Sequence, residues 1–301
     1  MACYMAKEKG RNRVQVYHAD DSELSLRFGE MAWVQRLHMA LEENRFCLYA
    51  QEIAALGHTD PGNGHIEVLL RLHDEAGRII LPDSFIPAAE RYGLMTSLDR
   101  WVVENVFKII ARCMHERPGQ PMAMCAINLS GITIGDDDFL GFLRDKFAAY
   151  SIPAEMICFE ITETSAIANL GSAIRFINEL KALGCHFSLD DFCAGMSSFA
   201  YLKHLPVDFL KIDGSFVKDM LDDPINRAMV EVINHIGHVM GKRTIAEFVE
   251  TPLIEQALLE IGVDYAQGYV IERPQLFTPD SLQCRPVRPQ PLLFKAPGTF
   301  R

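Results

Sequence analysis

The sequence contains no long apolar run and no surplus of positive charge, and these two absences exclude whole classes of protein. No stretch approaches the roughly 18–20 apolar residues that a membrane-spanning helix needs, and no signal peptide opens the chain. The formal net charge of −11 argues against a protein that binds polymeric nucleic acid, because such proteins usually present a basic face. We therefore expect a soluble, cytoplasmic fragment with no membrane contact of its own, although regions upstream of it could anchor the parent protein.

Metal-binding cysteine motifs are also absent. The eight cysteines show no CxxC or other zinc-like spacing. Cys125, Cys158 and Cys185 lie inside apolar runs, and we interpret them as small buried hydrophobic residues of a reducing compartment. His235 and His238 are neighbours on one predicted helix but lack a third partner, so packing is the favoured interpretation. Any metal site in this chain should therefore use oxygen ligands.

Short apolar runs alternate with segments of helical periodicity along most of the chain. This alternation predicts a mainly parallel sheet of the α/β class, and eight strands favour closure into a TIM-like (β/α)8 barrel, whose first strand can run antiparallel to the others. The predicted strands are 46–53, 65–72, 121–130, 155–162, 185–191, 208–213, 243–247 and 264–268. The predicted helices are 31–44, 83–92, 98–115, 137–150, 173–183, 226–241 and 252–261.

The two ends of the chain do not fit this alternation. Residues 1–20 predict one helix and one strand, which cannot bury enough surface to be stable alone and are interpreted as the end of a preceding domain. Residues 21–29 form a linker and residues 30–276 the barrel. The segment 277–301 is rich in proline and is expected to be an irregular or mobile extension.

Polar side chains lie at or just beyond the ends of the predicted strands. A parallel barrel gathers the C-terminal ends of its strands around one mouth, where active sites of this fold are built. Carboxylates and amides are the ligands that hard cations such as Mg²⁺ and Mn²⁺ prefer, and two such ions suit phosphodiester cleavage. The residues are Glu67, Asn128, Glu160, Asp190, Asp191, Lys211, Glu247 and Gln267.

Each of these residues alone has an ordinary explanation. A single carboxylate at a strand end is more often a helix N-cap or a surface residue, and Asp213 is interpreted in that way. The adjacent pair Asp190–Asp191 is more informative, because strand alternation would normally direct one of the two away from the mouth. If the strand ends at Asp190, both carboxylates can face the mouth. The placement of the whole set on consecutive strands therefore favours a metal site over chance.

Seven motifs in order give the chain a resemblance to the EAL-domain cyclic di-GMP phosphodiesterases. Glu67-Val-Leu-Leu-Arg71 is similar to the signature that names the family. The opening residues AKEKGRNRV resemble the end of a GGDEF diguanylate cyclase domain, although the cyclase motif itself is absent. The further motifs are Asn128-Leu-Ser130, Glu160-Ile-Thr-Glu163, Asp190-Asp191-Phe192, Lys211-Ile-Asp213, Ala246-Glu247-x-Val-Glu250 and Gln267-Gly-Tyr269.

The resemblance implies hydrolysis of cyclic di-GMP to linear pGpG with two Mg²⁺ or Mn²⁺ ions, in bacterial second-messenger signalling, by a homodimer. Lys211 matches a catalytic lysine, and Gln267 a residue that orients water or metal. Glu163 matches the carboxylate that steadies the loop after Asp191. The implied substrate contacts are Gln51, Arg71, Glu250 and Gln267. The implied metal ligands are Glu67, Asn128, Glu160 and Asp190 for one ion, and Asp190, Asp191 and Glu247 for the other.

The sequence departs from the family pattern at a few positions. Val68 replaces an alanine, and Glu52 stands where proline is common. Cys193 and Ala194 replace glycine and threonine in the loop after Asp191, so a positive φ at Cys193 would be strained. Retained but altered activity is expected. The alternatives are a receptor that holds cyclic di-GMP without cutting it, and a scaffold that only binds other proteins.

Overall fold

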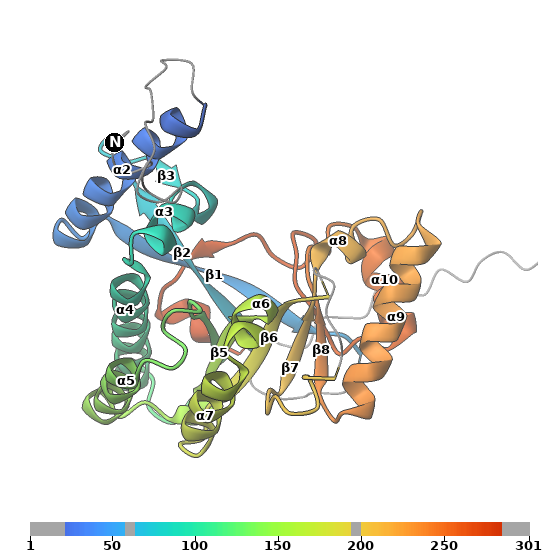
Figure 1. The fold of residues 1–301 in the computed structure, drawn as a ribbon. Helices are drawn as coiled ribbons and strands as arrows, with labels where there is room; N and C mark the ends of the chain where they lie inside the picture. Colours follow the sequence, from blue (N-terminus) through green and yellow to red (C-terminus); the bar gives the residue numbers. More distant parts are fainter. Residues whose placement is uncertain (1–21, 58–63, 194–199, 285–301) are drawn as a thin grey trace, which may run out of the picture. The chain divides into compact units, whose positions relative to one another are not determined.

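The computed structural model describes residues 22–57, 64–193 and 200–284, and Figure 1 shows its backbone. The chain divides into two compact units, and each is considered by itself. The smaller unit includes the residues up to Phe46 and Leu72–Leu94, while the larger includes Cys47–Arg71 and the chain from Met95 onward. The interpretation of residues 1–20 as the end of another domain lies outside the described residues.

Eight strands of the larger unit form a closed barrel. Parallel pairing runs from β2 through β4, β5, β6, β7 and β8 to β9. Strand β1 pairs antiparallel with β9 and closes the barrel by also pairing with β2. The predicted barrel and its antiparallel first strand are thus confirmed. The strands are β1 (Phe46–Ala55), β2 (His65–His73), β4 (Met124–Asn128), β5 (Ile157–Thr162), β6 (His186–Phe192), β7 (Phe209–Ile212), β8 (Arg243–Ala246) and β9 (Tyr265–Ala266).

Helices follow most of the parallel strands. The sequence predicts the bounds of α5 and α10 correctly, but it misses the short helices α6 and α8. These begin at single capping side chains, Thr162 and Asp213, which confirms the interpretation of Asp213 as an N-cap. A helix of one or two turns has too few residues to show periodicity. The helices are α4 (Met95–Glu116), α5 (Asp137–Tyr150), α6 (Glu163–Ala168), α7 (Leu170–Lys181), α8 (Gly214–Val217), α9 (Pro224–Val239) and α10 (Pro252–Ile261).

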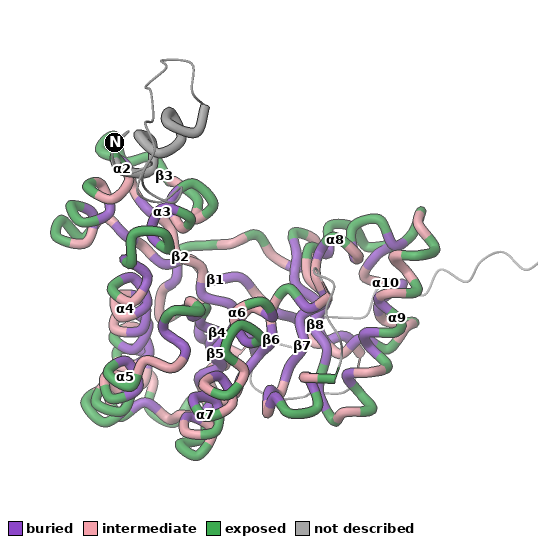
Figure 2. The backbone as a smooth tube through the Cα atoms, viewed as in Figure 1, coloured by how far each residue is buried: buried purple, intermediate pink, exposed green. Residues whose placement is uncertain are grey.

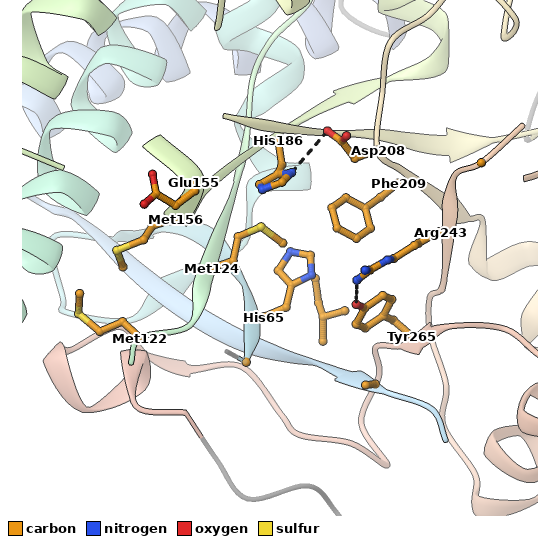
Figure 3. Close-up of a pocket in the computed structure, with 14 residues that line it drawn as sticks. His65, Met122, Met124, Glu155, Met156, His186, Asp208, Phe209, Arg243 and Tyr265 are labelled. Carbon is orange, nitrogen blue, oxygen red and sulfur yellow. Dashed lines mark hydrogen bonds and ion pairs between the residues drawn. The ribbon is translucent and has the colours of Figure 1, made fainter. Parts of the chain in front are cut away.

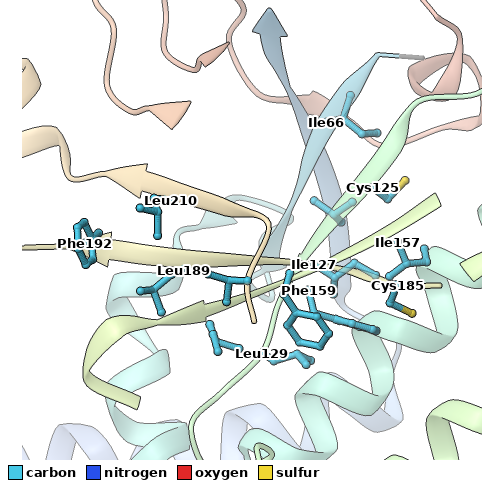
Figure 4. Close-up of a cluster of buried hydrophobic side chains, with 14 of the residues drawn as sticks. Ile66, Cys125, Ile127, Leu129, Ile157, Phe159, Cys185, Leu189, Phe192 and Leu210 are labelled. Carbon is cyan, nitrogen blue, oxygen red and sulfur yellow. The ribbon is translucent and has the colours of Figure 1, made fainter. Parts of the chain in front are cut away.

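The strands have two buried faces with different roles. Alternate residues such as Ile157, Phe159 and Ile161 of β5 face outward and join the hydrophobic core beneath the helices (Figure 4). Cys158, one residue out of step, belongs to a second apolar cluster inside the barrel, with Ile53, Ala126, Phe209, Ile245 and Tyr265. The strands are buried while the helices keep an exposed side (Figure 2). The three cysteines predicted to be buried, Cys125, Cys158 and Cys185, are buried and free.

The smaller unit contains α2 (Ser22–Glu42), β3 (Ile79–Ile80), the 3-10 turn η1 (Pro82–Ser84) and α3 (Ile86–Arg91). Phe85 is fully buried there, and its ring packs against the rings of Trp33 and Phe46. Helix α2 begins well before the predicted residue 31. No helix among the described residues combines the length and the apolar character that crossing a membrane requires.

The first part of the predicted C-terminal extension is packed rather than irregular. Strand β10 (Gln275–Leu276) pairs with β1, and the 3-10 turn η3 (Pro279–Leu282) follows it. Phe277 and Leu282 are buried, and Arg117 donates to the carbonyl of Pro279 at 3.2 Å. Elsewhere in the larger unit, the 3-10 turn η2 (Ala154–Met156) directly precedes β5. Proline-rich sequence alone did not reveal that these apolar side chains have core positions to fill.

Candidate active site

Strand alternation directs the candidate residues to the inside of the barrel. Ile66 and Val68 of β2 belong to the outer core, so Glu67 between them faces inward. The same holds for Glu160, which lies between Phe159 and Ile161 on β5. Both glutamates lie within their strands rather than at strand ends, and they are 6 % and 1 % exposed. The expectation of strand-end positions is therefore wrong for these two, although they reach the predicted mouth.

Lys211 is the centre of the site. It lies on β7, is fully buried, and carries its ammonium group into a ring of four carboxylates. Burial alone would lower its pKa, but the surrounding carboxylates raise the pKa well above the ordinary value. The ammonium is therefore held in its charged form. Its Nζ lies 2.8 Å from Glu247 Oε1, 3.0 Å from Glu160 Oε2, 3.3 Å from Asp190 Oδ1 and 3.6 Å from Glu67 Oε2.

Glu67 is held by two amide side chains. Asn128 donates to Oε1 and Gln267 donates to Oε2, each at 2.6 Å. Burial would raise the pKa of Glu67, but Lys211 and these two hydrogen bonds lower it below its ordinary value. Gln267 also donates to Oε1 of Gln51 at 3.2 Å, and Gln51 donates to the carbonyl of Glu272 at 2.8 Å. A chain of amides thus fixes Glu67 as a carboxylate anion.

Glu160 has the opposite environment. Its burial raises its pKa well above the ordinary value despite the contact with Lys211. Its Oε1 is buried and has no hydrogen-bond partner among the described residues. A buried carboxylate oxygen without a partner is costly, and a cation is the kind of group that would satisfy it. Glu160 therefore fits the predicted role of a metal ligand.

The pair Asp190–Asp191 occupies a distortion of β6. The strand does not end at Asp190, which was the condition under which both carboxylates were expected to face the mouth. It continues to Phe192 with a register shift against β7 between Leu189 and Phe192. Asp191 has a φ of 53°, in the left-handed region. This irregularity breaks the strand alternation and lets both carboxylates serve the mouth. Ligand oxygens of Asp190, Asp191 and Glu247 lie within 4.8 Å of one another, so these residues can hold a metal ion.

The mouth has more acidic groups than one lysine can neutralise. Burial raises the pKa of Glu247 to about 8, and burial together with Asp190 raises the pKa of Asp191. Crowded carboxylates raise one another's pKa values when no cation compensates them. The donor set of carboxylates and one amide, without histidine or cysteine, suits a hard divalent cation. This supports the oxygen-ligand type of site predicted from the sequence.

Glu163 anchors the segment that follows Asp191. It is buried at the start of α6, accepts the backbone N–H of Cys193 at 3.0 Å, and accepts the hydroxyl of Tyr201. Cys193 has a φ of 69°, which is the positive φ that the sequence analysis identified as strained for a residue with a Cβ. Ala194 lies outside the described residues. The sequence did not point to Tyr201, because a single tyrosine outside any motif gives no signal of such a contact.

Two predicted substrate contacts, Arg71 and Glu250, have no hydrogen bond to the carboxylate ring among the described residues. Burial lowers the pKa of Arg71, although the charge of Glu67 acts to raise it. Arg71 is half-buried beside the ring of Tyr49 and donates to the carbonyl of Leu70 at 2.8 Å. Glu250 is exposed after β8. Gln51, by contrast, is 7 % exposed and tied into the amide chain beside Glu67. Of the predicted substrate residues, only Gln51 and Gln267 are thus joined by hydrogen bonds to the carboxylate ring.

Asp99 is a further polar residue that the sequence reasoning missed. It lies on α4, is 4 % exposed, and accepts hydrogen bonds from the backbone N–H of Ser130 at 3.1 Å, its hydroxyl at 2.7 Å and the hydroxyl of Thr133 at 2.5 Å. Burial raises its pKa. The contacts fix the loop directly after Asn128. The sequence feature that could have identified Asp99 is its position on the apolar face of a predicted helix.

This arrangement defines a class: a (β/α)8 barrel with an acidic, cation-binding mouth built around one buried lysine. Comparison with known families then places the chain within that class. A sequence model of the family described as "EAL domain" matches residues 34–274, and the chain belongs to this family.

Relatives and solved structures agree with this assignment. The chain is 40 % identical over 275 residues to the cyclic di-GMP phosphodiesterase PdeB of Shewanella oneidensis, covering 91 % of this chain and 32 % of that protein. It is 36 % identical over 259 residues to the cyclic di-GMP phosphodiesterase PdeF of Escherichia coli, covering 86 % and 34 %. The chain thus spans about a third of the length of these relatives.

Among solved structures, the FimX EAL domain of Pseudomonas aeruginosa bound to c-di-GMP has a TM-score of 0.73 and 32 % identity, covering 82 % of this chain and 96 % of that one. The PaMucR phosphodiesterase in complex with c-di-GMP has a TM-score of 0.74 and 27 % identity, covering 81 % and 98 %. These likenesses support the barrel described above.

Proposed function

We propose that this chain hydrolyses cyclic di-GMP to linear pGpG with two divalent cations, Mg²⁺ or Mn²⁺. The observation that carries the proposal is the convergence of four carboxylates on Lys211 inside the barrel mouth. Two of them, Asp190 and Glu247, also lie close enough to Asp191 to hold one ion with it. Relatives named as cyclic di-GMP phosphodiesterases, and neighbours solved with c-di-GMP, support the choice of substrate.

The proposed ligands divide into two overlapping sets that share Asp190. Glu67, Asn128, Glu160 and Asp190 would hold one ion, and Asp190, Asp191 and Glu247 the other. When bound, such ions activate a water molecule and neutralise charge on a phosphoryl group. The unpartnered oxygen of Glu160 supports the first set, and the 4.8 Å grouping supports the second.

Lys211 is proposed to act as a fixed positive charge. Its Nζ lies within 3.6 Å of four carboxylates, which favour the charged form, so we assign it the role of a cation rather than of a base. A buried ammonium can instead orient the attacking water and stabilise negative charge that develops on the phosphate. Its carboxylate contacts hold it in place before substrate arrives.

The remaining residues are proposed to position substrate and ligands. Gln267 orients Glu67 through its 2.6 Å hydrogen bond, and Gln51 supports Gln267 from behind. The guanidinium of Arg71 would bind a phosphate or a guanine edge, either of which matches its planar set of donors. Glu250 would contact substrate from the exposed side of the mouth. Glu163 would set the conformation of the segment after Asp191.

The proposal is tested by measuring pGpG formation by the purified chain with Mg²⁺, Mn²⁺ or EDTA. We expect turnover that depends on the added ion and falls at least about 100-fold in Glu67→Gln, because one charge of the mouth is removed. Glu231→Gln, an exposed glutamate on α9, is the matched control and should leave turnover unchanged.

Other results would lead to different conclusions. Tight binding of cyclic di-GMP with no turnover under either ion would favour a receptor. The strained Cys193 would then be the first candidate for the cause of the lost turnover. Absence of both binding and turnover would overturn the proposal. The homodimer, the cytoplasmic location and the GGDEF origin of residues 1–20 stay predictions; light scattering after gel filtration tests the first.

A further inference from the structure

A cavity of about 410 Å³ lies at the end of the barrel opposite the acidic mouth. Its lining includes residues that begin parallel strands, namely His65 of β2, Phe209 of β7 and Tyr265 of β9, so it belongs to the N-terminal ends of these strands. Figure 3 shows these side chains with three methionines around the same space. Its volume lies within the range of small-molecule sites, roughly 300–1,000 Å³.

His65 is the unusual group in this cavity. It is 4 % exposed, and neither of its ring nitrogens has a hydrogen-bond partner among the described residues. The ring lies 5.5 Å from the ring of Phe209 and 6.2 Å from that of Tyr265, measured between centroids. A buried polar group left unsatisfied costs about 1–3 kcal/mol. An apolar side chain of similar size would fill the position without this cost, so packing alone does not account for a histidine.

Two charged residues at the edge of the cavity, Asp208 and Arg243, already have hydrogen-bond partners. Asp208 accepts hydrogen bonds from Lys181 and from the backbone of Phe187. Arg243 donates to the hydroxyl of Tyr265 at 2.6 Å. Because Asp208 and Arg243 already have partners, the part of the cavity beside Phe209 and Tyr265 does not require a charged ligand. Among the buried polar atoms of the described lining residues, the two nitrogens of His65 are the ones without a hydrogen-bond partner.

Water is a less suitable occupant than an organic ring. A buried water needs about two to four polar partners. Here the ring nitrogens of His65 are surrounded by Phe209, Tyr265 and the side chain of Met124 (Figure 3). Aromatic rings and thioethers offer weak hydrogen bonding but good contacts to flat ring faces.

We propose that this cavity is a binding site for a neutral, planar heteroaromatic molecule of one or two fused rings. Its polar edge hydrogen-bonds His65, and its faces pack against Phe209, Tyr265 and Met124. The site is separate from the acidic mouth, because His65 and Phe209 precede Glu67 and Lys211 by two residues on the same strand faces. The proposal therefore does not depend on the activity proposed above.

Benzimidazole is the test probe, since it has two fused rings, an N–H donor and a ring acceptor. Indene, which has the same shape without the polar atoms, is its matched control. Calorimetric titration of the full chain should give a saturable benzimidazole site with a Kd below about 1 mM, and indene should bind at least about tenfold more weakly. His65→Phe should remove this preference. Ala55→Phe, opposite Tyr265 on β1, should fill the cavity and abolish binding of both probes.

Three results would overturn the proposal: no saturable binding of benzimidazole, equal binding of the two probes, or unchanged binding in both variants. If the variants fail to fold, the wild-type chain still decides the question. Benzimidazole should then show nuclear Overhauser effects to methyl-labelled Met122, Met124 and Met156, assigned by methionine-to-leucine substitutions. Their absence at saturating probe would exclude this cavity.

Discussion

The two ends of the barrel are formed by the same strands but present different chemistry. The mouth has Glu67 on β2, Lys211 on β7 and Gln267 directly after β9. The opposite end has His65, Phe209 and Tyr265, each two residues earlier in the chain. Phe209 and Tyr265 of the opposite end belong to the inner apolar cluster, together with Ala126, Cys158 and Ile245.

The difference shows how one inner face can carry two environments. Side chains two residues apart on a strand point the same way but lie about 7 Å apart along it. A step of two residues along a strand is therefore enough to pass from a crowded set of charges to an aromatic cavity. At the mouth the carboxylates surround a lysine, whereas at the opposite end the nitrogens of His65 have no hydrogen-bond partner among the described residues.

The largest expected effect comes from removing the central cation. Lys211→Met leaves four carboxylates without their ammonium, so we expect a loss of about 3–5 kcal/mol in the free energy of unfolding and loss of hydrolysis. Lys242→Met is the control, because this buried lysine donates to the carbonyls of Leu205 and Val207 at 2.9 Å each and touches no mouth residue. Urea unfolding and pGpG formation measure both effects; equal losses of activity in the two variants would contradict the central role of Lys211.

The two ends should respond to pH in opposite directions. The pKa of Glu247 is raised by burial to about 8, so in EDTA its contribution to stability is present at low pH and is lost as pH rises from about 4.5 to about 8. Asp208 differs. Burial would raise its pKa, but the nearby His186 and hydrogen bonds from Lys181 and the Phe187 backbone lower it to about 2, so its contribution is lost as pH falls from about 4 to about 2.

Urea unfolding in EDTA across this range provides the measurement. Glu247→Gln should flatten the alkaline side by on the order of 2 kcal/mol, and Asp208→Asn should flatten only the acid side. A stability curve unchanged on the alkaline side in Glu247→Gln would show that this carboxyl ionises normally.

A smaller effect is expected from Glu163, which acts through the segment after Asp191 rather than by contact with substrate. Glu163→Gln weakens the hold on the Cys193 N–H and on Tyr201, so the Mn²⁺ concentration for half-maximal activity should rise about tenfold. Tyr201→Phe removes only one of these bonds and should have a weaker effect. An unchanged metal requirement with a lowered unfolding free energy would indicate a purely structural role.

The smallest effect concerns the strained Cys193. Cys193→Gly removes the Cβ at a φ of 69° and should raise the free energy of unfolding by up to about 1 kcal/mol, after the greater flexibility of glycine in the unfolded chain is subtracted. Cys193→Ala keeps the Cβ and should give no gain. Equal stability of the two variants in thermal and urea unfolding would show that the left-handed conformation carries no measurable strain.

Sequence patterns predicted the elements whose signals are local. Helices α5 and α10 have the predicted bounds, and the positive φ values of Gly184, Gly241 and Gly262 occur at the predicted helix-to-strand transitions. The sequence patterns did not predict the short helices α6 and α8, because each depends on a single capping side chain. They also did not predict the burial of Phe277, because distant residues supply the core position that it fills.

The sequence by itself determined that this chain has alternating strands and helices and a set of oxygen ligands in the order of the EAL motifs. Only the tertiary structure decided that Lys211 contacts four carboxylates and that a register shift in β6 lets Asp190 and Asp191 both face the mouth. It also decided that Asp99 holds the loop after Asn128, and that His65 has no hydrogen-bond partner among the described residues. The physical reason is that alternation fixes which way a side chain points on its own strand. Which side chains meet inside the barrel depends on the register and closure of strands that are far apart in sequence.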